Sequence, residues 1–433
     1  MEATRPTPVS RHFVVVLLLI LTLTGAVRVS YIFAFKQDKA PCAVLPPDNL
    51  CGDALVYHEG ANLLADGKGF IAPPRYLYGE GDRYQSADHP PLYTVYLAAF
   101  SFVGLSSVLA HQLATALLGL VGVVMIALLG RELRNERTGL MAAALAGIWV
   151  NLWISDGLVM SETSAVMLTA ALLWRTYRFW REPTLRDAII VGAVGGLTAL
   201  TRAELILYLP LVAIAMTIRL VPGWRGRLRL LGGMTVAGAL VIAPWVVRNL
   251  TTFEEPVLLS TGLGITLAYT NCDPVYHGDL IGYWFYPCAQ PIPLERDQSL
   301  DEKVFRQRAT KYVKAHKSRV PLVVTVRVLR QWSLFRPDQH TAFDTFEDRE
   351  RTLSRIGLLQ YYVAIPFAVG GLVVLRRRRI PVWPLLAVGV IVTFAAALTY
   401  GNTRFRSPFD VVLVTLTAVA LDRLWSSWRS EPS

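Results

Sequence analysis

Long apolar runs recur along the chain and are separated by short clusters of basic residues. Runs of roughly 17 to 22 apolar residues just cross the hydrocarbon core of a bilayer. Backbone polar groups find no water inside lipid, so such runs should be helices. We predict an all-α polytopic membrane protein with about ten spans. The predicted spans are 12–33, 109–130, 139–154, 161–180, 188–200, 205–218, 228–247, 358–375, 382–398 and 411–424.

The first run, 12–33, follows a short basic start that contains Arg5 and Arg11. It is longer than the apolar region of a signal peptide, and no clear small-residue cleavage site follows it. We therefore predict a retained span. The fifth and sixth runs are short and meet at 201–204, which predicts broken helices that dip toward a site.

The arginine clusters indicate one orientation. With the N-terminus in the cytoplasm, every internal cytoplasmic loop carries at least three arginines, in agreement with the positive-inside rule. These residues are Arg131, Arg134 and Arg137; Arg175, Arg178, Arg181 and Arg186; Arg219, Arg225, Arg227 and Arg229; and Arg376, Arg377, Arg378 and Arg379. Both termini are then cytoplasmic. The orientation depends on treating the short run 92–103 as an interfacial helix, because one more span would invert everything after it.

This topology leaves two long extracytoplasmic segments, 36–111 and 248–355, within a single transmembrane domain, 1–433. We predict a short helix at 53–65 and interfacial helices at 92–103, 300–316 and 321–335.

All four cysteines fall in the two outer segments, where disulfides persist. Their spacing favours the pairs Cys42–Cys51 and Cys272–Cys288, with free thiols as the alternative. No zinc-binding pattern is present.

Composition agrees with a membrane location. Hydrophobic residues make up 53% of the chain and charged residues 17%, whereas soluble domains carry about a quarter charged residues. The net charge of +11 is explained by the topology arginines. We exclude nucleic acid as a partner because no recognition motif accompanies the charge. No Walker or Rossmann glycine pattern appears, so an outer-face enzyme would need a lipid-linked donor.

Acidic residues in the outer regions could carry chemistry. Asp53 opens a predicted helix, and Tyr57 lies one turn later on the same face, where it could contact a substrate. Asp53 could act as a general base or serve only as a helix N-cap. Asp156 and Glu162 flank the turn between the third and fourth spans, either as functional carboxylates or as solvated turn residues.

Arginines also lie at the predicted outer ends of spans, against the usual bias: Arg202, Arg248, Arg404 and Arg406. Arginine binds phosphate through two parallel hydrogen bonds and keeps its charge. The set therefore suggests a lipid phosphate, whereas snorkelling or pairing with carboxylates is the alternative for each. His89, which precedes Pro90 and Pro91, could bind a phosphate or a sugar, or be structural.

Several short motifs, in this order and spacing, resemble the GT-C glycosyltransferases, specifically the protein O-mannosyltransferases and the lipid A aminoarabinose transferases. The motifs are Gly52-Asp53 with Tyr57 and 64–69, His89-Pro90-Pro91-Leu92-Tyr93, Ser161-Glu162-Thr163, 196–202, Pro244-Trp245 with Arg248-Asn249, and Arg404-Phe405-Arg406 with Pro408. The resemblance covers nearly the whole chain.

The resemblance implies an inverting transfer from a polyprenyl-phosphate-linked sugar, with Asp53 as the base. The acceptor would be a glycan, lipid or protein hydroxyl, in a bacterial plasma membrane with the active site extracytoplasmic. The four outer arginines and His89 would stabilise the departing phosphate. A divalent metal ion is compatible with this chemistry, although no residue pattern demands one. A lipid-linked sugar flippase or transporter is the alternative function.

Overall fold

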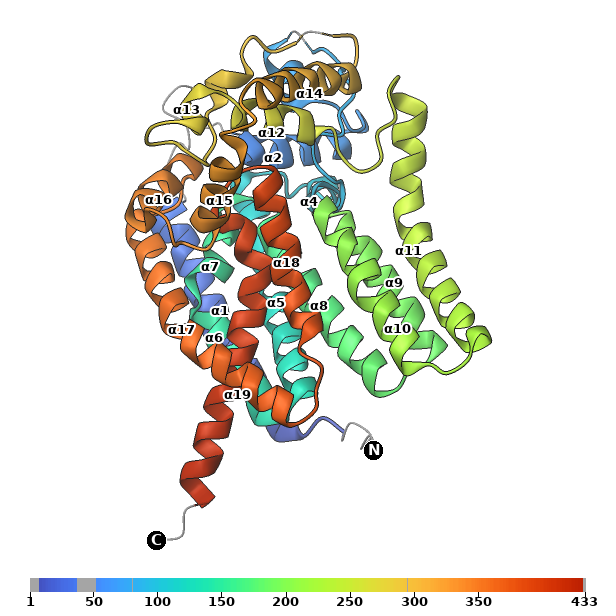
Figure 1. Cartoon of the computed structure of the whole chain (residues 1–433), viewed down its shortest axis with the longest axis vertical. Helices are drawn as coiled ribbons and strands as arrows, with labels where there is room; N and C mark the ends of the chain where they lie inside the picture. Colours follow the sequence, from blue (N-terminus) through green and yellow to red (C-terminus); the bar gives the residue numbers. More distant parts are fainter. Residues whose placement is uncertain (1–7, 37–51, 80, 294, 431–433) are drawn as a thin grey trace.

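The computed structural model describes residues 8–36, 52–79, 81–293 and 295–430. Figure 1 shows a bundle of long helices that run roughly parallel to one axis, with a layer of shorter helices across its upper end. Helix α1 begins and helix α19 ends at the opposite, lower end.

The helices of the bundle form at the predicted spans. They are α1 (Arg11–Tyr31, continued by a π-helical turn, Ile32–Lys36), α5 (Val108–Leu133), α6 (Glu136–Ile148), α8 (Glu162–Arg181), α9 (Leu185–Ala199), α10 (Ala215–Leu220), α11 (Trp224–Thr252), α17 (Arg351–Arg377), α18 (Trp383–Leu398) and α19 (Ser407–Ser430). Helix α10 is preceded by a 3-10 turn, Ala203–Leu207, and a π-helical turn, Leu209–Ile214, in agreement with the irregular sixth span.

Five of these segments in the described residues are long and apolar enough to cross a membrane individually, or six if a bent pair is included. Helices α8, α9, α18 and α19 lie in the same bundle but are shorter or more charged. The all-α membrane fold is therefore confirmed, and the number ten remains a prediction.

The third predicted span is bent. Helix α6 ends at Ile148, and α7 (Val150–Trp153) continues into a 3-10 turn, Ile154–Leu158, at 75° to it. Gln360 of α17 donates a hydrogen bond to the Ile148 carbonyl (2.8 Å) and accepts one from the Val150 N–H (2.9 Å). An apolar environment penalises unpaired peptide groups, so this side chain stabilises the break.

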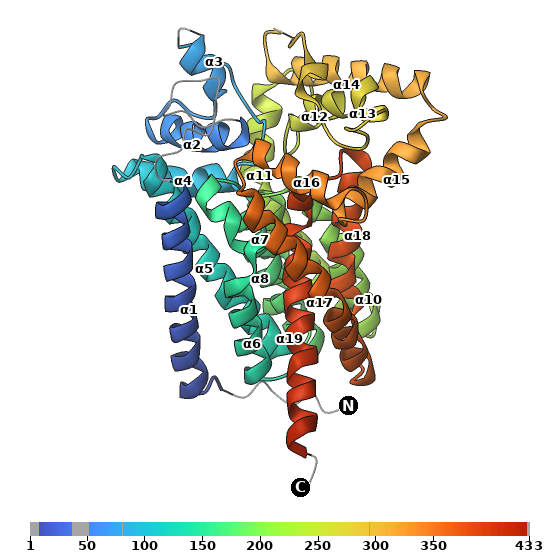
Figure 2. The ribbon, with the colours of Figure 1, turned by 90° about the vertical axis from the view of Figure 1, so that its left-hand side faces the viewer.

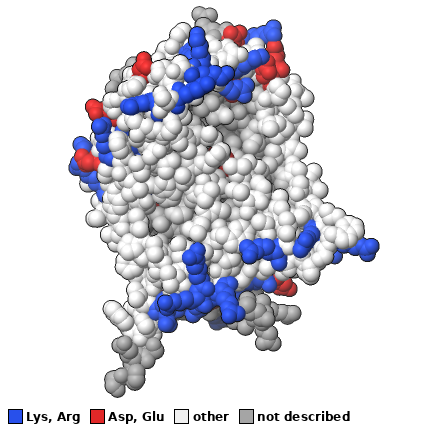
Figure 3. Space-filling model, viewed as in Figure 1, with Lys and Arg blue, Asp and Glu red and all other residues white. Residues whose placement is uncertain are grey.

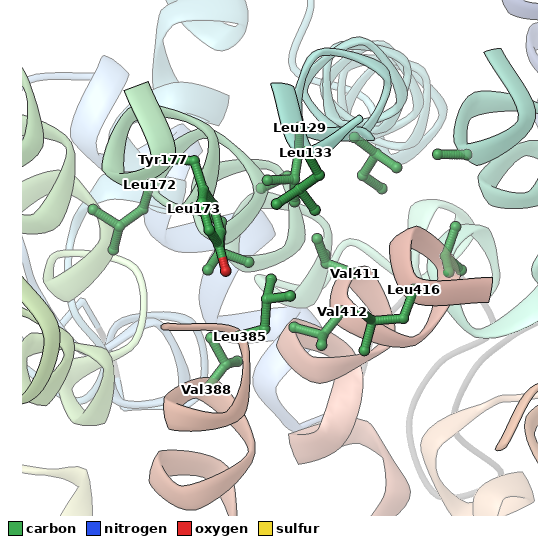
Figure 4. Close-up of a cluster of buried hydrophobic side chains, with 14 of the residues drawn as sticks. Leu129, Leu133, Leu172, Leu173, Tyr177, Leu385, Val388, Val411, Val412 and Leu416 are labelled. Atoms are coloured by element: carbon green, nitrogen blue, oxygen red, sulfur yellow. The ribbon is translucent and has the colours of Figure 1, made fainter. Parts of the chain in front are cut away.

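The core of the bundle is an apolar cluster between helices that are far apart in the sequence. Figure 4 shows side chains of α5, α8, α18 and α19 that meet there: Leu129, Leu133, Leu172, Leu173, Tyr177, Leu385, Val388, Val411, Val412 and Leu416. All of them are buried. Packing across these helices fixes the ends of α8 and α19 at the upper layer.

The two segments predicted to be extracytoplasmic, which we call the outer segments, build the upper layer (Figure 2). The first supplies α2 (Gly52–Ala65), α3 (Pro73–Tyr78) and α4 (Leu92–Phe102). The second supplies α12 (Gly262–Thr270), α13 (Asp273–Tyr276), α14 (Gln298–Ala315), α15 (Val320–Gln331), α16 (Pro337–Phe343) and the 3-10 turns Tyr286–Ala289 and Asp344–Glu347. The helices predicted at 53–65, 92–103, 300–316 and 321–335 are thus present.

Helices α14 and α15 each pack residues against protein, and their interfacial position remains a prediction. Phe305 and Ala309 of α14 pack with Ala268 of α12 and Ala289. The Arg327 side chain of α15 is buried and donates to backbone carbonyls. Val323 and Val326 of α15 pack with Val275 and Ile281.

The disulfide Cys272–Cys288 is present and joins α12 and α13 to the turn Tyr286–Ala289. The predicted pair Cys42–Cys51 lies outside the described residues.

Charged residues gather at the two ends of the molecule. Figure 3 shows lysine and arginine in a band near the lower end, and both signs of charge at the upper end. The face between them is almost uncharged. This distribution is typical of a protein whose middle contacts lipid.

Candidate active site

Asp53 and Arg404 form an ion pair at the upper end of the bundle. Asp53 lies in the first turn of α2, where the helix dipole favours a carboxylate. Arg404 lies in the 3-10 turn η7 (Thr403–Arg406), between α18 and α19. Its Nη2 atom donates to Asp53 Oδ2. The fold therefore joins the predicted base to one of the predicted phosphate-binding arginines.

Arg404 binds two further carboxylates. Its Nε atom lies 2.8 Å from Glu162 Oε1, and its Nη1 atom donates to Glu347 Oε1 at 3.3 Å. Each nitrogen of the guanidinium thus faces a different carboxylate. The arrangement uses the planar fork of arginine, which a lysine could not reproduce.

Glu162 also connects Arg404 to Arg202. Arg202 Nη1 donates to Glu162 Oε1 (3.2 Å) and its Nε donates to Glu204 (2.8 Å). Arg349 Nε lies 4.0 Å from Glu347 Oε2. We call this set the carboxylate–arginine cluster: Asp53, Glu162, Arg202, Glu204, Glu347, Arg349 and Arg404. Four acids and three arginines leave one negative charge in excess.

His89 and Tyr57 line the other side of Asp53. His89 Nε2 lies 3.6 Å from Asp53 Oδ1, and His89 Nδ1 lies 3.4 Å from Asp88. The Tyr57 ring lies 4.8 Å from the His89 ring, and its hydroxyl donates to Ser161 Oγ (3.0 Å). The predicted shared face of Asp53 and Tyr57 is therefore present.

These contacts shift the pKa values of Asp53 and His89. Burial by itself raises the pKa of Asp53, but Arg404 and His89 outweigh it and hold this pKa below its ordinary value. Burial lowers the pKa of His89, but Tyr57, Asp88 and Asp53 raise it well above its ordinary value. Asp53 is then ionised and His89 protonated at neutral pH. A carboxylate held this way is a weak base until a partner leaves.

Arg248 lies apart from the cluster. It donates to the carbonyls of Phe70 and Ser86 (2.9 Å each) and to the side chain of Gln85 (2.8 Å). These hydrogen bonds connect the first outer segment to the C-terminal part of α11.

Arg406 and Asp156 are also elsewhere, each in a buried pair. Arg406 Nε lies 3.4 Å from Asp410, and its guanidinium lies 3.6 Å from the centre of the Tyr361 ring. Asp156 Oδ2 accepts from Arg28 Nε at 2.6 Å. Asp156 and Glu162 are 0% and 1% exposed, so the alternative of solvated turn residues is wrong for both.

The sequence reasoning missed Glu347. This residue lies in the 3-10 turn η6 (Asp344–Glu347), and its Oε1 atom also accepts from Asn402 Nδ2 (2.9 Å). Burial raises the pKa of Glu347, although Arg404 and Arg349 oppose this. A dense run of charges at 344–351, just before a predicted span, was the signal that could have found it. Among the described residues, no three His, Cys, Asp or Glu side chains are grouped as metal ligands.

Part of the sequence matches a known protein family. Residues 88–247 match the family described as dolichyl-phosphate-mannose-protein mannosyltransferase. This region contains His89, Glu162 and Arg202. None of the curated protein sequences matches the chain.

Solved structures give whole-chain similarity. AglB from Archaeoglobus fulgidus, an archaeal oligosaccharyltransferase in complex with an inhibitory peptide and a dolichol-phosphate, aligns with a TM-score of 0.57 at 14% identity, over 97% of this chain and 51% of AglB. The Archaeoglobus fulgidus oligosaccharyltransferase in complex with Zn and sulfate gives 0.55 at 13%, over 96% and 49%. ArnT from Cupriavidus metallidurans gives 0.41 at 16%, over 93% and 77%.

The chain spans about half the length of the oligosaccharyltransferases that it matches. Identities this low establish the fold alone, and the lower score to ArnT supports no argument. Both findings nevertheless support the resemblance seen in the sequence: residues 88–247 match a mannosyltransferase family, and nearly the whole chain shares its fold with the oligosaccharyltransferase AglB.

Proposed function

We propose that the protein is a membrane glycosyltransferase that moves a sugar from a polyprenyl phosphate to an acceptor hydroxyl at the extracytoplasmic face. The observation that carries this proposal is the contact of Asp53 with Arg404 and His89. A carboxylate beside cations provides a proton acceptor and phosphate-binding groups in one place.

In the proposed reaction, one bond forms and one bond breaks at the anomeric carbon of the sugar. The acceptor oxygen attacks the anomeric carbon while the bond from that carbon to the phosphate oxygen breaks. The acceptor proton passes to Asp53, and the lipid phosphate leaves with the electron pair. Attack opposite to the leaving group inverts the anomeric configuration. Asp53, which is one-third exposed, is accessible to an acceptor.

Arg404 couples donor binding to the strength of the base. All three of its nitrogens already face carboxylates, so an incoming phosphate has to replace one of them. Asp53 is the most exposed of the three and the easiest to displace. Its release from Arg404 raises its pKa, because the nearest positive charge is then neutralised by phosphate. The donor would thus activate the base.

Arg202 and His89 are the other phosphate-binding candidates in this proposal. Arg202 lies beside Arg404 because both contact Glu162 Oε1, and His89 is the cation on the opposite side of Asp53. We assign Arg248 and Arg406 to the fold because they bind outside the carboxylate–arginine cluster. Arg248 donates to carbonyls of the first outer segment, and Arg406 pairs with Asp410.

The donor class is supported by two comparisons. The matched family is described by a dolichyl-phosphate-linked mannose, and AglB is complexed with a dolichol-phosphate. Mannose or a pentose, joined to a polyprenyl phosphate, is the donor we expect. Glycan, lipid and protein hydroxyls all remain candidate acceptors.

Purified protein in proteoliposomes, supplied with radiolabelled sugar on a polyprenyl phosphate, tests the proposal. We expect label to move from lipid to an acceptor fraction, with release of polyprenyl phosphate. Movement of intact labelled lipid between leaflets, without transfer, would instead support the flippase alternative.

A further inference from the structure

A basic face of α14 in the second outer segment has no role in the proposed reaction. Helix α14 carries Lys303, Arg306, Arg308, Lys311 and Lys314 along 12 residues. Its opposite face is fixed, because Phe305 and Ala309 are buried against α12. The basic residues thus project from a firmly packed helix.

The basic residues divide into two groups. Lys303 pairs with Glu255, and Arg308 donates to the carbonyls of Ala289 and Pro291. Arg306, Lys311 and Lys314 are exposed, and Arg306 has only the Glu302 carboxylate of the preceding turn at 3.3 Å. In the described part of the chain, Lys311 and Lys314 have no carboxylate partner. Protein groups therefore leave most of this charge uncompensated.

The second group lines a hollow. Arg306, Gln307, Thr310, Lys311 and Lys314 border an open surface depression of about 530 Å³, and no acidic side chain is among its lining residues. Figure 3 shows a basic band across the upper layer, where Figure 1 places α14. Side chains from Arg306 to Lys314 span about 12 Å along the helix.

We propose that this face binds an anionic glycan, a chain that carries carboxylate groups at repeated intervals. Three flexible cations spread over about 12 Å suit repeated charges better than one small ion, because no rigid fork surrounds a single point. A lipid headgroup fits less well, since α12 lies between α14 and the helix bundle in Figures 1 and 2.

The glycan would reach the candidate active site as its acceptor. This part of the inference rests on the proposed glycosyltransferase function, whereas binding itself does not. Hydroxyl groups on the same chain are the nucleophiles that the reaction needs.

The test measures binding of a fluorescent oligogalacturonate, with a neutral dextran oligomer of equal length as the control ligand, to the detergent-solubilised full chain. The variant Arg306→Ala/Lys311→Ala/Lys314→Ala removes the three exposed charges that line the depression, of which only Arg306 has a carboxylate partner in the described residues. The matched control Arg296→Ala/Lys303→Ala/Arg336→Ala removes three charges from the same layer that are paired with Glu254, Glu255 and Asp279.

We expect wild type to bind the oligogalacturonate and not the dextran, with affinity falling at least tenfold between 50 and 500 mM NaCl because salt screens exposed charges. The first variant should lose at least tenfold in affinity, and the control variant less than threefold. A parallel measurement offers the wild-type protein vesicles of anionic lipid in place of the oligogalacturonate. Equal losses in both variants, no binding of the oligogalacturonate by wild type, or binding to the vesicles alone would overturn the proposal. Since sugar transfer is not measured, these outcomes are independent of the proposed enzyme activity.

Discussion

Arg404 and Asp53 lie 351 positions apart and form one ion pair in the folded chain. The pair joins the turn before the last helix to the first helix of the upper layer. Glu162 and Glu347 hold the remaining two sides of the Arg404 guanidinium. One residue thus connects both outer segments and the bundle, so its replacement should affect structure as well as chemistry.

Asp53→Asn should abolish most transfer and leave the fold intact. General-base assistance contributes typically about 10²–10⁴ in rate, and asparagine keeps the shape while losing the proton acceptor. Transfer of radiolabelled sugar and the thermal midpoint are the measurements. Asp66→Asn, at an exposed carboxylate just beyond the same helix, is the matched control and should transfer normally. Wild-type turnover by Asp53→Asn would remove Asp53 from the mechanism.

Arg404→Ala should lower stability by about 3–5 kcal/mol, because it leaves buried carboxylates without their partner. Glu162 and Glu347 expose only 2% and 9% of their side chains. Adding Glu347→Gln to this variant should recover part of the loss, since one uncompensated charge disappears. Denaturation in a fixed detergent measures both effects.

Arg336→Ala provides the comparison for the Arg404 variants. Its partner Asp279 is 84% exposed, and surface pairs contribute about 0–1 kcal/mol. Equal losses for Arg336→Ala and Arg404→Ala would contradict the importance assigned to the carboxylate–arginine cluster.

The folded chain should lose stability as pH rises, because His89 then loses its proton. Its pKa is raised in the folded chain, so its contribution is fully present below the unfolded value, about 6.5. The contribution is lost as pH rises through the folded value. Asp53 has the opposite sign: its pKa is lowered, and its contribution is lost only as pH falls below the ordinary range of aspartate.

Thermal midpoints of wild type and His89→Gln between pH 6 and 10 isolate this effect, because every other titrating group is common to both. Wild type should lose its advantage over the variant as pH increases. Parallel curves across the range would show that His89 does not carry the proton that its contacts favour.

Gln360→Leu should destabilise the bend after α6. It removes partners from the Ile148 carbonyl and the Val150 N–H, and a peptide group left unpaired away from water costs about 1–3 kcal/mol. Val363→Ala changes an exposed position on the same helix and should stay within about 0.5 kcal/mol. A Gln360 variant as stable as the Val363 variant would mean that the bend needs no side-chain support.

The sequence by itself determined the helices. Apolar length is a property of about 20 consecutive residues, so the runs at 109–130 and 358–375 predicted α5 and α17 without knowledge of the fold. The pair Cys272–Cys288 was also predictable from local sequence, because the two cysteines are only 16 positions apart.

Only the tertiary structure decided which charges meet. Arg404 and Arg406 are two positions apart and of one residue type, yet one contacts Asp53 and the other Asp410. Their directions depend on how η7 (Thr403–Arg406) packs against helices from distant parts of the chain. Ion pairing is a short-range contact, whereas local sequence fixes only which face of its own helix a side chain takes. Glu347 became visible as a partner of Arg404 only once the second outer segment was folded over the bundle.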